Sequence, residues 1–297
     1  MNPRPFVALL VSVWLCAGGR PAAAAGVVHL VDTQTQSTTI LVPGLTSELK
    51  VLQITDAHIS RVVPAETNML PYGGRMHQAY ATTRRHFSQN VQKSTFDYLG
   101  DVLQRAKEQQ VELLLLTGDI VNFPSAASVD YVHQRLKQTG IPWLYIAGNH
   151  DWHYEGLPGS LEKLRATWTK RSLRPLYQGH NPLCYSAVIK GINFVGIDNS
   201  TGSVSAEQVG FLKKQLRRKE PVVLFSHIPY TLEGKGALDL ATLVGPARAE
   251  GGGLVAIFAG HTHRASYCFS GDTCQYVSLA GFQGASFMVR FKGATRN

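Results

Sequence analysis

Five short apolar runs in this chain end in a small or hydroxyl residue, and each is followed within four positions by a carboxylate, a histidine or an asparagine. Such runs are typical of strands buried on both faces of a sheet, so the polar residues lie where strands leave the core, the edge at which open α/β sheets bind ligands. The runs and the polar residues after them are 51–55 before Asp56 and His58, 113–117 before Asp119, 143–147 before Asn149, His150 and Asp151, 222–226 before His227, and 255–259 before His261 and His263. This collection of oxygen and nitrogen ligands favours a site for hard or borderline divalent metals.

The first 25 residues are typical of a secretory signal peptide. Arg4 precedes an apolar or small stretch at residues 6–17, which is too short to span a bilayer comfortably, and the alanines ending at Ala25 suit cleavage. We therefore expect residues 26–297 to be exported, either secreted or periplasmic, with no transmembrane segment after cleavage. The alternative is an uncleaved N-terminal anchor that keeps the same domain at the membrane.

The charge of the chain favours an anionic substrate or surface without identifying it. The formal net charge is +9 and falls to +7 when residues 1–25, with two arginines and no acids, are removed. The basic runs at 213–214 and 217–219 have the helical spacing of a solvated face. Because no aromatic residues interleave with them, we expect no specific nucleic-acid binding.

Three cysteines remain after the first 25 residues. Cys268 and Cys274 flank residues 270–272, a predicted hairpin turn, and an exported protein can hold a disulfide between them. The alternative is a pair of reduced cysteines. Cys184 has no nearby partner typical of a nucleophilic pair or a zinc site, so we expect it to be buried.

The remaining pattern alternates between strands and helices and predicts one domain of two mixed sheets with helices on the outer faces. Residues 27–42 are expected to form a hairpin, and residues 60–94, rich in Pro, Gly and charge, an irregular segment. The other expected elements are helices near 96–106, 129–136, 160–168, 205–218 and 237–249, strands at 184–189 and 192–197, and three short strands within 265–291.

Two of the polar clusters place ligands two residues apart. Asp56 and His58 flank one residue, as do His261 and His263, and side chains two apart in an extended segment point the same way. A single His-x-His is weak, because many histidines are ordinary surface or core residues. Two such pairs, with the Gly-Asp and Gly-Asn-His-Asp segments between them, make chance coincidence improbable.

Taken together, these clusters resemble the five-block signature of the calcineurin-like metallophosphoesterases in order and spacing over residues 51–263. The resemblance implies an α/β fold, a four-layer αββα sandwich of two mixed β-sheets flanked by helices. It also implies two divalent metal ions (Mn, Fe, Zn or Ni) at the strand ends. By position, the first ion is held by Asp56, His58 and His263, the second by Asn149, His227 and His261, and both by Asp119.

The resemblance further implies hydrolysis of a phosphodiester substrate by attack of a metal-bridging hydroxide. His150 is then the general acid, and Asp151 hydrogen-bonds its imidazole. The alternatives are that His150 is a further ligand and that Asp151 caps a helix or turn. A phosphomonoesterase with the same centre, and a noncatalytic metal-binding module that keeps the fold, are the alternative functions.

Differences from named subfamilies narrow the resemblance. Asn122 stands where purple acid phosphatases place a tyrosine ligand, Asp151 where Ser/Thr protein phosphatases have glutamate, and His150 where lipid A precursor hydrolases have arginine. The chain therefore resembles the bacterial phosphodiesterases and class III cyclic-nucleotide phosphodiesterases.

Substrate selectivity is predicted to lie outside the ligand set. Residues 60–94 follow directly after the first strand end, so they are placed to cover the site. They would then offer Arg75, His77, Arg84 or His86 to a phosphate or head group. The alternative is a solvent loop with scattered charge.

Overall fold

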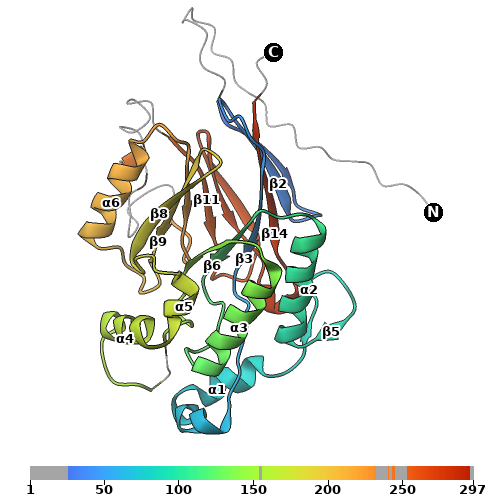
Figure 1. Ribbon diagram of the computed structural model, residues 1–297, viewed down its shortest axis with the longest axis vertical. Helices are drawn as coiled ribbons and strands as arrows, with labels where there is room; N and C mark the ends of the chain where they lie inside the picture. Colours follow the sequence, from blue (N-terminus) through green and yellow to red (C-terminus); the bar gives the residue numbers. More distant parts are fainter. Residues whose placement is uncertain (1–25, 154–155, 232–239, 241–242, 245–252, 295–297) are drawn as a thin grey trace, which may run out of the picture.

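Figure 1 shows the computed structural model of the protein, which describes residues 26–153, 156–231, 240, 243–244 and 253–294. The predicted signal peptide and most of the predicted 237–249 helix lie outside these residues.

Two six-stranded mixed sheets form the centre of the molecule, as the sequence predicted. The first has the order β1-β2-β14-β3-β6-β7 and the second β12-β13-β11-β10-β9-β8. Strands of the first sheet are β1 (Val28–Asp32), β2 (Ser37–Val42), β3 (Leu49–Ile54), β6 (Leu113–Thr117), β7 (Trp143–Ile146) and β14 (Phe287–Gly293). Those of the second are β8 (Cys184–Ile189), β9 (Ile192–Ile197), β10 (Val222–Phe225), β11 (Leu254–Ala259), β12 (Ser266–Ser270) and β13 (Thr273–Val277).

Helices cover the outer faces and make four layers (Figure 1). They are α1 (Leu70–Tyr80), α2 (Thr95–Glu108), α3 (Ala126–Thr139), α4 (Leu161–Trp168), α5 (Arg174–Tyr177) and α6 (Ala206–Leu216). Neighbouring residues of β3 face different cores. Val51 belongs to the core between the two sheets, and Leu52 belongs to the core under α2 and α3. A third core packs α6 on the second sheet.

The helix starts follow simple capping chemistry. Ser94, Ser125, Ser160 and Ser205 each accept a backbone N–H three residues later, at the starts of α2, α3, α4 and α6. Gly140 ends α3 with a φ of 70°. The predicted helices at these places are confirmed.

The prediction of an irregular segment at 60–94 is wrong in part. This segment contains a 3₁₀ helix (η1, Pro64–Met69), α1 and the short hairpin β4–β5 (Arg84–Arg85 and Gln92–Lys93). Pro71 sits in the first turn of α1, where its missing N–H costs no hydrogen bond. Proline there starts the helix and does not break it.

The hairpin predicted near residue 271 is confirmed, but the predicted disulfide is not formed. Cys268 pairs with Gln275 and Cys274 with Phe269, one residue out of the register that a bridge needs. Neighbouring positions on a strand face opposite sides, so Cys268 is exposed and Cys274 buried, both as free thiols. Cys184 is buried, as predicted.

None of the helices in the described ranges is long and apolar enough to cross a membrane.

Candidate metal centre

The predicted ligands meet where strands from both sheets end. Backbone hydrogen bonds join the loops: Asp56 N–H donates to Gly118 O at 3.0 Å, and His58 N–H to Asp119 O at 2.9 Å. Across the sheets, the Gly281 N–H donates to the carbonyl of Thr55 at 2.8 Å.

Sharp turns at these strand ends aim the side chains inward. Five ligand positions have a left-handed backbone, with φ between 48° and 70°: Asp56, His58, Asp119, His261 and His263. Residues other than glycine seldom take this conformation, and it occurs often at functional sites.

The first ligand cluster is Asp56, His58 and His263. The Asp56 Oδ1 lies 3.2 Å from the His263 Nε2 and 3.8 Å from the His58 Nε2, and the two Nε2 atoms are 3.3 Å apart. Two donors bound to one ion at about 2.1 Å are roughly 3.0–3.4 Å apart when they meet at right or tetrahedral angles. The spacing of this cluster is therefore close to that of a coordination sphere.

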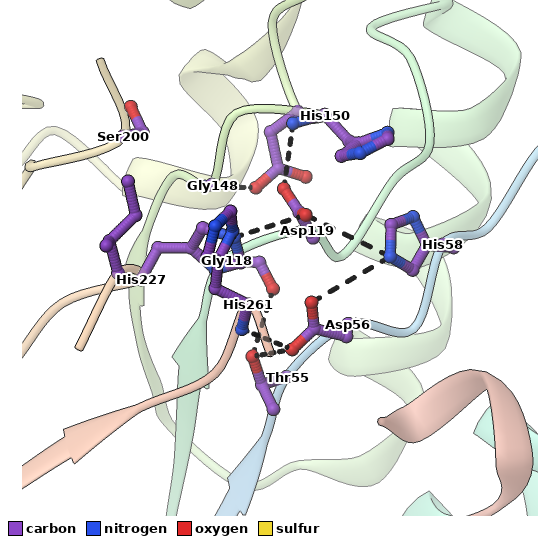
Figure 2. A network of polar contacts seen from close by, with 12 residues as sticks. Thr55, Asp56, His58, Gly118, Asp119, Gly148, His150, Ser200, His227 and His261 are labelled. Carbon is purple, nitrogen blue, oxygen red and sulfur yellow. Dashed lines mark hydrogen bonds and ion pairs between the residues drawn. The ribbon is translucent and has the colours of Figure 1, made fainter. Parts of the chain in front are cut away.

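The second cluster contains Asp119, His227 and His261. The His227 Nε2 is 3.1 Å from the Asp119 Oδ2 and 3.2 Å from the His261 Nδ1. The same Asp119 Oδ2 lies 3.9 Å from the His58 Nε2, so it stands between the clusters (Figure 2). The other oxygen, Oδ1, accepts the backbone N–H of His150 at 2.8 Å. One oxygen of Asp119 therefore faces both clusters.

Two further contacts orient the histidines. The His227 Nδ1 donates to the carbonyl of Thr117 at 2.9 Å, and the His58 Nδ1 lies 3.1 Å from the Asn122 Oδ1. Such contacts hold the proton on Nδ1 and leave the Nε2 lone pair for a metal. In the sequence, Asn122 stood out only as the residue at the position where purple acid phosphatases have a tyrosine ligand. That position, three residues after Asp119, is the sequence signal for a residue close to the metal centre.

The donor atoms fit divalent cations. Asn149 Oδ1 is buried and has no hydrogen-bond partner in the described part of the chain, an arrangement that a bound cation would satisfy. Glycines at 148 and 260 keep the backbone close, because a Cβ at Gly148 would overlap the Asp119 carboxylate and one at Gly260 would overlap the Thr55 hydroxyl. The centre thus provides two neighbouring groups of nitrogen and oxygen ligands.

The electrostatics favour a positive charge at this point. Burial opposes a charged His227, but the adjacent Asp119 carboxylate outweighs it and raises the pKa of His227 to about 10. Burial also acts against ionised Asp119, yet His227 holds the pKa of this carboxyl below its usual range. A cation at the His227 Nε2 would take the place of the proton that Asp119 favours there. Burial lowers the pKa of His58 to about 4, so its imidazole is neutral and able to bind a metal.

His150 lies beside the clusters, with its ring edge-on to His58 and the centroids 4.8 Å apart. Its Nδ1 is buried without a hydrogen-bond partner in the described residues. The predicted hydrogen bond from Asp151 to this imidazole is wrong. Both Asp151 oxygens accept backbone N–H groups at 2.8 Å, Oδ1 from Val121 and Oδ2 from Gly148. Asp151 therefore ties the loops together, in keeping with the alternative of a turn cap.

An aromatic wall that the sequence did not reveal borders the first cluster. The ring of Tyr80, at the end of α1, stacks on His58 at 4.2 Å and 9°. Phe282 contacts it edge-on at 5.2 Å and lies 5.0 Å from His263. The Arg84 guanidinium lies over the Tyr80 ring at 5.2 Å, and its buried Nε has no hydrogen-bond partner within the described ranges. These three residues are the aromatic wall.

The other predicted substrate residues are His77, His86 and Arg75, and both histidines have structural partners. His77 contacts the Ser60 hydroxyl at 2.6 Å, and the His86 Nδ1 accepts the backbone N–H groups of Ser88 and Gln89. Arg75 is an exposed residue of α1. Of the four predicted substrate residues, Arg84 alone belongs to the aromatic wall beside the first cluster.

A profile of the calcineurin-like phosphoesterases matches residues 49–265. The chain belongs to this family. Curated relatives include a "Probable cyclic nucleotide phosphodiesterase" of Psychrobacter arcticus, 33% identical over 35% of this chain and 32% of its own length. Another is a "Probable glycerophosphodiester phosphodiesterase" of Arcobacter nitrofigilis, 28% identical over 52% of this chain and 58% of its own length. This calcineurin-like phosphoesterase therefore aligns with less than two thirds of either relative.

Solved structures agree with the fold. A dimetal phosphatase of Danio rerio superimposes with a TM-score of 0.54 at 13% identity, covering 79% of this chain and 88% of that one. A purple acid phosphatase of yellow lupin gives 0.50 at 14% identity, covering 88% and 48%. The predicted sandwich of two mixed sheets is confirmed.

Proposed function

We propose that this calcineurin-like phosphoesterase hydrolyses phosphodiesters with two divalent metal ions. The observation that carries the proposal is the pair of clusters that share the Asp119 Oδ2, completed by the unpartnered oxygen of Asn149. Bound cations would polarise phosphoryl oxygens and lower the pKa of a water molecule. The residues of the chain hold, orient and shield this chemistry.

Each group around the clusters then has a defined task. Asp56, His58 and His263 would hold the first cation, Asn149, His227 and His261 would hold the second, and Asp119 would hold both. We assign to the His150 imidazole the proton that the departing alkoxide needs, and its ring contact with His58 beside the first cluster supports this assignment. Asp151 fixes that loop through Gly148.

The aromatic wall supports a diester in preference to a monoester. A diester carries a second organic group, and Tyr80 and Phe282 provide an apolar surface for it next to the first cluster. The Arg84 guanidinium over the Tyr80 ring adds a positive charge beside this surface. The names of the curated relatives, which are phosphodiesterases, agree with this preference.

The proposal is tested with bis(p-nitrophenyl) phosphate and p-nitrophenyl phosphate. The chain is stripped of metal and reloaded separately with Mn²⁺, Fe²⁺, Zn²⁺ or Ni²⁺. We expect turnover of the diester to exceed that of the monoester and to vanish in Asp119→Ala and His261→Ala while the circular dichroism spectrum stays unchanged. Faster monoester turnover would favour a phosphomonoesterase. A rate no higher than that of metal alone on both esters, with metal bound, would favour the noncatalytic metal-binding module.

We also propose that the domain acts outside the cytoplasm, on the strength of the apolar stretch at residues 6–17 and the small residues up to Ala25. Expression of the full chain in a bacterium with two membranes, followed by fractionation and N-terminal sequencing, tests this. A mature chain that begins at or near Gly26 in the periplasm or medium is expected. A full-length chain in the membrane fraction would identify the anchor alternative.

A further inference from the structure

A second cavity lies apart from the metal centre. It has a volume of about 840 Å³ and is formed by α4, the π-helical turn η2 (Thr169–Leu173), α5 and residues 179–183. In Figure 1, α4 and α5 lie beneath the ends of β8 and β9. None of its lining residues is a predicted metal ligand. Its volume lies within the range that small-molecule pockets commonly have.

The lining combines an apolar wall with several cations. Ala166, Pro175, Tyr177, Pro182 and Leu183 supply the wall. Lys170 and Arg174 supply two positive charges against the one carboxylate of the lining, Glu162, and Arg165 supplies a third that lies beside the buried Asp198. The balance of charge favours an anion, and the wall favours an apolar body attached to it.

The π-helical turn explains how these side chains face one cavity. Along α4 and into the first residue of η2, positions 162, 165, 166 and 169 recur at the spacing of one helical face. The wider turn then brings Thr169 and Arg174, five residues apart, to the same side, while Leu173 stays fully buried in the core. π-Helical turns are rare and are frequent at functional sites.

Arg165 is held in place from inside the protein. Its Nη1 lies 3.5 Å from the Oδ2 of Asp198, which is completely buried, and its own side chain is 13% exposed. The other Asp198 oxygen accepts the N–H of Ser200 at 2.9 Å, and the Ser200 hydroxyl accepts the indole N–H of Trp152 at 2.8 Å. Ser200 appears beside the metal-centre loops in Figure 2. The guanidinium is therefore fixed before any ligand arrives, while Lys170 and Arg174 are exposed.

We propose that this cavity binds an amphipathic monoanion. The anionic head lies at Arg165, Lys170 and Arg174, and the apolar body lies against the apolar wall that contains Ala166 and Leu183. The site is independent of the proposed phosphodiesterase reaction. It would bind such a molecule whether or not the metal centre turns over.

Calorimetry with dodecanoate tests the proposal. The metal-loaded chain is titrated at pH 8, below the micellar concentration, and compared with dodecanol, dodecyltrimethylammonium and inorganic phosphate. We expect dodecanoate to bind at least about tenfold more tightly than each of the other three, because only dodecanoate combines a negative charge with an alkyl chain. Dodecanoate that does not bind, or binds no more tightly than the cationic analogue, overturns the proposal.

Variants locate the binding. Lys170→Gln with Arg174→Gln should weaken dodecanoate about tenfold and leave dodecanol unchanged, whereas Ala166→Trp should weaken both by occupying the cavity. The matched control is Lys213→Gln with Lys214→Gln on α6, which removes the same charge elsewhere and should change neither. Near-ultraviolet circular dichroism confirms that each variant is folded. Unchanged dodecanoate affinity in the Lys170/Arg174 variant places the binding elsewhere and overturns the proposal.

Discussion

Replacing Asn122 with leucine should weaken metal binding without touching a ligand. Asn122 is fully buried, its Oδ1 lies 3.1 Å from the Nδ1 of His58, and its Nδ2 donates to the Met76 carbonyl at 2.6 Å. Leucine has a similar size but makes neither contact. His58 then loses the partner that fixes its tautomer and ring angle.

The expected loss has two parts. Removing a partner of a metal-bound histidine typically weakens the metal 10- to 100-fold, or about 1.4–2.7 kcal/mol. Loss of the hydrogen bond from Asn122 to the Met76 carbonyl lowers the free energy of unfolding by about 0.5–1.5 kcal/mol in the metal-free chain. Affinity is measured by competition with a chromophoric chelator for Zn²⁺ or Mn²⁺, and stability by urea unfolding in EDTA.

Two further variants separate the parts. Asn193 is also fully buried and donates to Gln215 at 3.1 Å, but it contacts no metal ligand, so Asn193→Leu should lower stability and keep metal affinity. Asn122→Asp should restore affinity, because a carboxylate accepts from the His58 Nδ1–H. The reasoning is refuted if Asn122→Leu binds metal within twofold of the wild type while losing stability to the same extent as Asn193→Leu.

Four more changes test other parts of the structure. Tyr80→Leu should lower kcat/KM for the diester by about 2- to 12-fold, because the stacking of the ring is lost. Tyr80→Phe should stay near the wild type, and Tyr72→Leu, at an exposed position on the same helix, is the inert control. Equal effects of the two leucine variants would contradict the proposed role of the aromatic wall in binding the diester. Gly148→Ala should cost at least about tenfold in metal affinity, since its Cβ displaces the shared carboxylate, and chelator competition at wild-type strength would argue against that crowding. Burial raises the pKa of Asp198 above its unfolded value, so the folded chain keeps this proton to higher pH and loses the associated stability as the pH rises above about 4. Between pH 4 and 7, Asp198→Asn should therefore lose less unfolding free energy than the wild type. Parallel plots of unfolding free energy against pH for the two proteins would exclude the effect. A thiol reagent at pH 8 should label only Cys268 in the folded mature chain, and protection of this cysteine that is relieved by reductant would show a disulfide.

The strand ends could be predicted because their signal is local. A strand buried on both faces is apolar at every position, so the change to a polar residue marks its end in the sequence itself. Asp56, His58 and Asp119 were found in this way. The N-cap serines and Gly140 are local signals as well, and the helices that they bound were predicted at the right places.

Contacts that depend on packing or register could not be predicted. Tyr80 reaches His58 only because α1 forms in a segment whose prolines and glycines suggested a loop. Asp151 was paired with the neighbouring His150, but the loop turns it to Gly148 and Val121 instead. The disulfide prediction failed by one residue of strand register, which reverses the face that a side chain occupies.

The left-handed backbone at the ligand positions restricts which residues evolution can try there. Outside glycine, this conformation is best tolerated by aspartate, asparagine and histidine, the same side chains that bind borderline metals. A substitution at Asp56 or His261 must therefore satisfy two tests at once, and few residue types pass both. Substitutions at these positions should therefore be exchanges among Asp, Asn, His and Gly. A chain that loses its metals through such an exchange can keep the conformation of its loops. One further substitution among the same four residue types can then restore the ligand.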